Sequence, residues 1–311
     1  MTDERDGNDA ASGQDAVDEG EDDLRVEGET PAEPPTGPVA IGVDIGGSGI
    51  KGAAVEVTTG RLVSERIRVP TPQPSIPDAV IESTARVVER LARSAHVGAD
   101  TPVGVGFPAV VIDGIARTAA NVDKGWVDFP ADDRMEARLH RSVSLVNDAD
   151  AAGLAEMRFG AGAGHKGVVI VLTLGTGVGS GVFVDGVLVP NTELGHMEIR
   201  GRDAERRSAA AARVRRGLSW KAWATDLDEH LQAIDRIFWP QLFILGGGVS
   251  KRADKFIDRL TVRPPVIPAK LLNEAGIVGA AMVVAERSGL STTGPAIVTR
   301  TGEPSAVAAS A

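Results

Sequence analysis

In this sequence, several apolar stretches end in a glycine-rich segment that also contains polar side chains. The first is DIGGSGIKG, residues 44–52. Glycines without a Cβ let backbone N–H groups turn towards an anion. Ser48 adds a hydroxyl and Lys51 a cation, and Asp44 is suited to holding Mg²⁺ through water, because this ion usually retains several waters. The stretch therefore predicts a phosphate site, with a plain hairpin turn as the alternative. The residues expected to bind phosphate here are Gly46, Gly47, Ser48, Gly49 and Lys51.

Two further glycine turns follow apolar runs later in the chain. They are LGTGVGSG at residues 174–181 and LGGGVS at residues 245–250. Three such turns, each ending an apolar stretch, are hard to explain as ordinary connections, and together they indicate a donor with several phosphates. The residues expected to bind this donor are Gly175, Thr176, Gly177, Gly179, Gly247 and Gly248.

The elements around the first turn exclude a nicotinamide site. Residues 47–52 match G-x-G-x-x-G, but that fingerprint needs a helix after its glycines. Here alternating apolar residues predict a strand over 50–57, a turn, and a further strand over 61–69. The phosphate-loop pattern G-x-x-x-x-G-K-[ST] is also absent, because Lys51 precedes Gly52.

The strand–turn–strand pattern of residues 39–63 returns at residues 167–189. Such a repeat indicates two related lobes, each opened by a glycine turn. Two turns that face each other across a cleft would hold one polyphosphorylated ligand from both sides. Helical spacing of apolar residues is found over 75–96, 150–162 and 226–239. The expected class is α/β, with mixed sheets in two lobes around a central cleft.

The charge of the chain is concentrated at one end. Residues 1–38 carry 13 Asp or Glu against two Arg, a net −11, so the remaining 273 residues are close to neutral. This stretch also lacks aromatic residues, and we expect a disordered acidic tail. The small N-terminal lobe is predicted over 39–146 and the large lobe over 147–270. A closing helix over 271–288 is expected to pack back on the small lobe, and 289–311 to be a disordered tail.

Composition narrows the class of protein. The 311 residues are enough for two domains, and the chain has no cysteine, which excludes disulfides and thiolate chemistry. No apolar run approaches the roughly 20 residues that span a bilayer, and the N-terminus has no signal-peptide pattern. We therefore expect a cytoplasmic protein that does not bind membranes.

Four motifs together resemble the ROK family of sugar kinases and repressors. They are DIGGSGIK at 44–51, LGTGVGS at 174–180, ELGH at 193–196 and LGGGVS at 245–250. The match covers roughly residues 39–288 in the family's order. NVDKGWVDFP after GFPAVV, and GRDAE after ELGH, resemble the actinobacterial polyphosphate glucokinase branch. The resemblance implies the actin-like ATPase (ribonuclease H-like) fold and a homodimer.

The resemblance also assigns roles to polar residues. It implies that Asp148 is the catalytic base, and a carboxylate at a strand end can accept a proton from a sugar hydroxyl. Asn147, Glu193, His196 and Asn121 are implied to hydrogen-bond the sugar together with Asp148. The alternatives are a helix N-cap for Asn147-Asp148, and a surface Glu with a core His for the other pair.

One departure from the family concerns zinc. Many members follow ELGH with a cysteine-rich zinc motif that ends in a sugar-binding glutamate, and this chain has no cysteine there. We expect no structural zinc, His196 held by packing or hydrogen bonds, and Glu205 as the displaced glutamate. The same segment is strongly basic, which predicts either a solvated helix face or a track for a long polyanion. Its cations are Arg200, Arg202, Arg206, Arg207, Arg213, Arg215, Arg216 and Lys221.

The expected activity is therefore that of a glucokinase. It would move a phosphoryl group from inorganic polyphosphate, with ATP also accepted, to the 6-hydroxyl of glucose, with Asp148 as general base and Mg²⁺ as cofactor. One alternative is a strictly ATP-dependent hexokinase for glucose, mannose or an N-acetyl sugar. Others are a sugar-sensing regulator or a non-catalytic sugar-binding protein. The acidic residues 1–38 offer no DNA-binding helices, so no nucleic-acid partner is expected.

Overall fold

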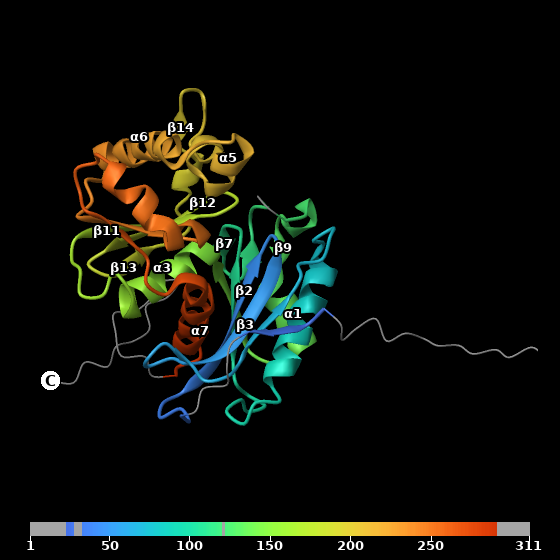
Figure 1. Cartoon of the computed structure of the whole chain (residues 1–311). Coiled ribbons are helices and arrows are strands. Elements are labelled where there is room, and N and C mark those ends of the chain that lie inside the picture. Colours follow the sequence, from blue (N-terminus) through green and yellow to red (C-terminus); the bar gives the residue numbers. More distant parts are fainter. Residues whose placement is uncertain (1–22, 28–32, 120–121, 291–311) are drawn as a thin grey trace, which may run out of the picture.

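The computed structural model describes residues 23–27, 33–119 and 122–290. Two sheets form the centres of two lobes, and helices α3 (Asp148–Phe159) and α7 (Ala275–Arg287) lie between them (Figure 1). Helix α7 packs on the first sheet, α3 packs on the second, and the two helices pack on each other. In the part of the chain that the structure describes, no helix has the length and apolarity needed to cross a membrane.

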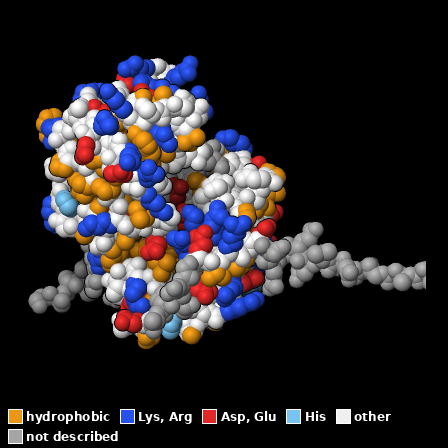
Figure 2. Space-filling model, in the orientation of Figure 1, with side chains coloured by type: hydrophobic (Ala, Val, Ile, Leu, Met, Phe, Trp, Pro, Cys, Tyr) orange, Lys and Arg blue, Asp and Glu red, His pale blue; other side chains and the backbone are white. Residues whose placement is uncertain are grey.

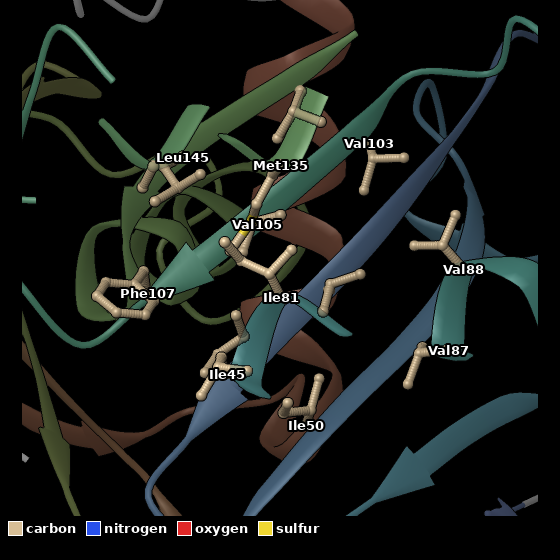
Figure 3. Packing of buried hydrophobic residues seen from close by; sticks show 14 of the residues in the cluster. Ile45, Ile50, Ile81, Val87, Val88, Val103, Val105, Phe107, Met135 and Leu145 are labelled. Atoms are coloured by element: carbon tan, nitrogen blue, oxygen red, sulfur yellow. The ribbon is translucent and has the colours of Figure 1, made fainter. Parts of the chain in front are cut away.

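The first sheet has seven strands in the order β1-β5-β3-β2-β6-β10, with β4 also paired to β3. Strands β2 and β3 form an antiparallel hairpin, and β6 and β10 run parallel to β2. Helices α1 (Pro77–Leu91) and α2 (Ala131–Leu139) supply buried residues to the core of this lobe, part of which Figure 3 shows. The strands are β1 (Arg25–Glu27), β2 (Val39–Gly46), β3 (Gly49–Glu56), β4 (Arg61–Leu62), β5 (Arg66–Val69), β6 (Val103–Phe107) and β10 (Val143–Asn147).

The second sheet repeats the arrangement of the first. Its order is β13-β12-β11-β16-β17, with an antiparallel hairpin β11–β12 and with β16 and β17 parallel to β11. This order matches β5-β3-β2-β6-β10 strand for strand, which confirms the α/β fold of two related halves. The strands are β11 (Val168–Leu174), β12 (Val178–Val184), β13 (Val187–Val189), β16 (Leu242–Gly246) and β17 (Val266–Pro268).

Smaller elements complete the lobes. Helix α6 (Trp220–Phe238) packs on the second sheet, where Trp223, Leu227 and Leu231 join its apolar core. The others are β7 (Val111–Ile112), β8 (Ile115–Ala116), β9 (Phe129–Pro130), β14 (Glu198–Ile199), β15 (Arg202–Asp203), α4 (Glu205–Ser208) and α5 (Ala210–Arg215). Short 3₁₀ turns occur at Lys124–Trp126, Leu194–His196, Gly248–Lys255, Ile257–Arg259 and Leu272–Glu274.

Some element boundaries differ from the sequence prediction. The single strand expected over 61–69 is broken into β4 and β5, because the Ser64 hydroxyl accepts the Ala54 N–H and donates to the Glu65 carbonyl. Helix α6 begins at Trp220 rather than at 226, since the Ser219 hydroxyl caps it by accepting the Ala222 N–H. Local side-chain bonds of this kind override apolar spacing.

Part of the predicted N-terminal tail is ordered, so that prediction is wrong for residues 23–27 and 33–38. Strand β1 pairs antiparallel with β5, and Glu27 forms an ion pair with Arg66 at 2.7 Å. Further on, the buried Glu56 carboxylate accepts the backbone N–H groups of Thr36 and Gly37. These contacts order a stretch whose composition alone cannot form a core. Residues 1–22 and 291–311 lie outside the described residues.

Helix α7 approaches its neighbours at backbone distance. Gly42 and Gly104, paired in β2 and β6, lie beneath it, and a Cβ on them would come within 1.9 and 1.8 Å of a helix carbonyl oxygen. On the other side of the helix, a Cβ on Gly279 would come within 1.7 Å of the Ala151 carbonyl oxygen in α3. Glycine at these three positions lets β2, α7 and α3 stack closely, and this stacking sets the spacing between the lobes.

Candidate active site

A cavity of about 660 Å³ opens between the lobes, and Figure 2 shows a hollow there. It brings together three glycine turns, the start of α3 and the segment that contains ELGH. Of the predicted site residues, the cavity is lined by Gly46, Gly47, Ser48, Lys51, Asn147, Asp148, Gly175, Thr176, Gly177, Gly179, Glu193, His196, Glu205, Gly247 and Gly248.

The first glycine turn is the tip of the β2–β3 hairpin. Gly46 pairs with Gly49, which leaves a two-residue turn of Gly47 and Ser48. Lys51 stands opposite Asp44, with its Nζ 3.5 Å from Asp44 Oδ2, so the predicted cation and the predicted metal ligand form an ion pair. Asp44 and Gly49 are the two predicted residues of this turn that do not line the cavity.

The second and third turns lie against each other. The second connects β11 to β12, and the Gly175 N–H donates to the Gly177 carbonyl. The third follows β16, where Gly247 has φ +79° and a Cβ would lie 2.4 Å from the Leu174 carbonyl oxygen. Only glycine fits that left-handed position beside another backbone.

Asp148 is the first residue of α3, directly after β10. Asn147 caps the helix: its Oδ1 accepts the N–H groups of Ala149 and Asp150, and its Nδ2 donates to the Ala109 carbonyl. The cap therefore coexists with a cavity-facing Asp148. The pKa of Asp148 is raised to about 7, because burial disfavours its charged form and the nearby Asp44 carboxylate disfavours a second negative charge. A carboxyl group with this pKa is suited to accept a proton near neutral pH.

The ELGH segment supplies a second group of polar side chains. His196 Nδ1 lies 3.2 Å from Asp203 Oδ2, and His196 Nε2 lies 3.8 Å from Glu193 Oε2. Glu205 lies on the other side of the group and accepts the Val178 N–H at 3.0 Å. Burial raises the pKa of Glu193, with His196 lowering it and Glu205 raising it. The imidazole and three carboxylates form a wall that can hydrogen-bond several hydroxyls of a polyol.

Several residues of the site were not among the predicted ones. Asp203 pairs with His196 and lies in the GRDAE motif. Lys124 lies in the NVDKGW motif, lines the cavity and donates to the Ala119 carbonyl at 2.7 Å. Asn191 had no local signal. The predicted sugar contact Asn121 lies outside the described residues.

Asn191 joins the two lobes beside the cavity. Its side-chain amide bonds Val111 of β7 twice, accepting the N–H and donating to the carbonyl, both at 2.9 Å. Its own N–H donates to Asp150 Oδ2 in α3 at 2.8 Å. The other oxygen of Asp150 has no hydrogen-bond partner among the described residues, and burial raises the pKa of Asp150 to about 7. This set fixes the first lobe against the start of α3.

The cysteine-based zinc site of many ROK proteins cannot form in this chain. His196, Asp203 and Glu205 place one possible ligand atom each within 4.8 Å of the others, which is compatible with a cation. Of these groups, His196 and Glu205 line the cavity. The absence of structural zinc stays a prediction.

Three of the eight cations in the basic segment pair with carboxylates of α6. Arg200 and Arg207 bond Glu229, Arg207 and Arg216 bond Asp226, and the Arg213 guanidinium lies 4.0 Å from the centre of the Trp220 ring. The segment's other five cations have no carboxylate partner among the described residues, so the solvated helix face and the polyanion track both stay predictions.

Two equivalent sheets that present glycine turns to one cavity, with a carboxylate between them, define a phosphotransferase of the actin-like ATPase fold. Residues 40–213 match the ROK family, and the chain belongs to this family. It is 49% identical over 243 residues to the polyphosphate glucokinase of Mycobacterium tuberculosis, covering 78% of this chain and 89% of that protein.

Solved structures give the same result. The inorganic polyphosphate/ATP-glucomannokinase of Arthrobacter sp. strain KM matches with a TM-score of 0.79 and 52% identity, over 80% of this chain and 99% of that one. A ROK glucokinase from Streptomyces griseus, in complex with glucose and AMPPNP, matches with a TM-score of 0.70 and 27% identity, over 80% and 99% of the two chains. The predicted family and fold are confirmed.

Proposed function

We propose that this protein is a glucokinase that transfers the terminal phosphoryl group of inorganic polyphosphate to the 6-hydroxyl of glucose, and that it also accepts ATP. The observation that carries the proposal is the position of Asp148 in one cavity between the phosphate-binding turns and the Glu193–His196 wall. Relatives named polyphosphate glucokinase and polyphosphate/ATP-glucomannokinase, both near 50% identity, support the donor and the sugar.

The reaction is a phosphoryl transfer with Asp148 as general base. The glucose hydroxyl attacks the terminal phosphorus while Asp148 accepts its proton, and the bond from that phosphorus to the bridging oxygen breaks, which leaves a donor shorter by one phosphate. Backbone N–H groups at Gly47 and Gly177, with the Lys51 ammonium, stabilise negative charge on the phosphoryl oxygens. Glu193, His196 and Glu205 orient the sugar, and closure of the lobes excludes water as a competing acceptor.

The residues present suit Mg²⁺. Asp44 and Asp148 are carboxylates close enough for one to raise the pKa of the other, and oxygen ligands are those that Mg²⁺ prefers. Asp44 would hold the ion through water. When bound, Mg²⁺ neutralises charge on the donor phosphates.

An ATP-only hexokinase and a non-catalytic sugar-binding protein are the rival proposals. A coupled assay that follows glucose 6-phosphate separates them, with nucleotide-free long-chain polyphosphate and ATP as parallel donors. We expect product with both donors and a higher kcat/KM with polyphosphate. Product with ATP but not with polyphosphate would support the ATP-only hexokinase. No product with either donor would support the non-catalytic sugar-binding protein. Reactions without sugar control for donor hydrolysis. A homodimer and a cytoplasmic location stay predictions from the sequence.

A further inference from the structure

A row of basic residues crosses the first sheet and starts at the candidate active site. Asp44 in β2 pairs with Lys51 in β3, Lys51 with Arg68 in β5, and Arg68 with Arg25 in β1. Directly opposed residues in a sheet point to the same face. The side chains of Lys51, Arg68 and Arg25 therefore form one row over two strand spacings, about 10 Å.

The row reaches from the first glycine turn to the edge of the sheet. The Arg68 guanidinium donates to the Ser48 carbonyl at 3.3 Å and lies against Gly49, 2.9 Å from where a Cβ would be. Arg25 is exposed on the edge strand. Figure 2 shows Lys and Arg side chains gathered beside the hollow between the lobes.

Like charges placed opposite each other across strands destabilise a sheet. In the next row of β1 and β5, opposite charges face each other: Arg66 lies opposite Glu27 and forms an ion pair with it at 2.7 Å. Among the described residues, no carboxylate pairs with Arg68 or Arg25. The guanidinium groups of Arg68 and Arg25 therefore repel each other in the free protein, and a polyanion bound along the row relieves this repulsion.

The other basic surface near the cavity is partly neutralised. In the segment from Arg200 to Lys221, three arginines are bonded to Asp226 or Glu229. Arg68 and Arg25 have no carboxylate partner among the described residues, and they stand in one row with Lys51, which lines the cavity.

We propose that Arg68 and Arg25 bind the phosphates of an inorganic polyphosphate chain that extend beyond those held by the glycine turns. The inference rests on the proposed function. Guanidinium groups suit this ligand because they bond phosphate oxygens in pairs and keep their charge. A donor of three phosphates ends before Arg25, so the outer part of the row acts on long chains only.

The test compares donors of different length in the full-length protein. Arg25→Gln and Arg25→Glu are measured with tripolyphosphate, ATP and long-chain polyphosphate. Arg93→Gln, which removes an exposed charge after α1 on the same lobe, is the matched control. Lys251→Gln, beside the third glycine turn, tests a route along the other lobe. Thermal unfolding verifies that each variant is folded.

We expect Arg25→Gln to raise the KM for long-chain polyphosphate about 1.5- to 5-fold, as for loss of one exposed charge pair, and Arg25→Glu to raise it further. The KM for the short donors stays unchanged, and Arg93→Gln behaves as wild type with every donor. Added salt should weaken the wild-type preference for long chains, because exposed charges are screened.

Two results would contradict these statements in different ways. In the first, the wild-type protein uses long-chain polyphosphate, but the Arg25 variants have the same KM for it, or the KM rises in Lys251→Gln instead. This result overturns the binding row and leaves the proposed function intact. A wild-type protein that phosphorylates glucose with ATP but with no polyphosphate refutes the proposed donor.

Discussion

At the scale of single residues, the proposed reaction depends on one carboxyl group whose surroundings disfavour its charged form. Asp148 is surrounded by protein atoms and lies near the Asp44 carboxylate, and both effects raise its pKa to about 7. In the proposed reaction, the same group accepts the proton of the sugar hydroxyl. The group is therefore less ionised at neutral pH than an exposed aspartate, and more basic once ionised.

A pH dependence follows from this pKa. The base must be ionised, and a carboxyl group with a pKa of about 7 is protonated below that pH, so kcat/KM should fall about tenfold per pH unit on the acid side. Steady-state kinetics over the pH range would measure this decrease in kcat/KM.

The variant Asp148→Asn, whose side chain is of nearly equal size, should lose at least about two orders of magnitude in kcat and still bind glucose. Near-normal turnover in this variant would remove Asp148 from the mechanism.

The sequence predicted which motif residues would lie together, and their roles stay predictions. The glycine turns, Asp148, Glu193, His196 and Glu205 all lie in recognisable motifs and line one cavity. Asn191 and the row through Arg25 could not be found, because their roles come from pairing across strands far apart in the chain. Asn147 has the cap role that its residue type favours, and a sugar contact by it stays a prediction.

At the scale of elements, the close stacking of α7 decides how the lobes are spaced. Helix propensity favours alanine over glycine by about 1 kcal/mol in a helix interior. At Gly279 the backbone of α3 occupies the space that a methyl group would need. The apolar pattern predicted this helix, but the sequence gives no sign that two backbones meet at its glycines.

Gly279→Ala should therefore destabilise the protein, against the helix-propensity expectation. Overpacking in a closed interior costs about 1–3 kcal/mol, which exceeds the propensity gain. Denaturant unfolding would measure the change. Gly98→Ala is the control, since its methyl group would meet its nearest neighbour at an ordinary 3.6 Å and should be neutral or slightly stabilising. Equal stability of Gly279→Ala and wild type would show that α3 and α7 can separate without cost.

At the scale of the whole molecule, the Asn191 side chain connects the two lobes near the Glu193–His196 wall. Asn191 bonds both backbone groups of Val111 and reaches Asp150 through its own N–H. Its φ of +58° is the left-handed region, which asparagine and glycine tolerate. The amide therefore sets how the first lobe lies against the start of α3.

Asn191→Gly keeps the backbone conformation and removes the two side-chain bonds. We expect a loss of about 1–3 kcal/mol in the free energy of unfolding, and a raised KM for glucose with either donor, because the cavity is less well closed. Asp113→Gly is the control, because Asp113 lies at an exposed left-handed turn and its side chain makes no hydrogen bond within the part of the chain that the structure describes. An unchanged glucose KM would show that closure does not depend on this contact.

The position of α7 has a consequence for synthesis of the chain. The β2 and β6 face that it covers is translated about 230 residues (β2) and about 170 residues (β6) before the helix itself. A ribosome that has completed the first sheet therefore leaves that face open to water and to other nascent chains. Native packing of this face is therefore completed only after α7 has been synthesised.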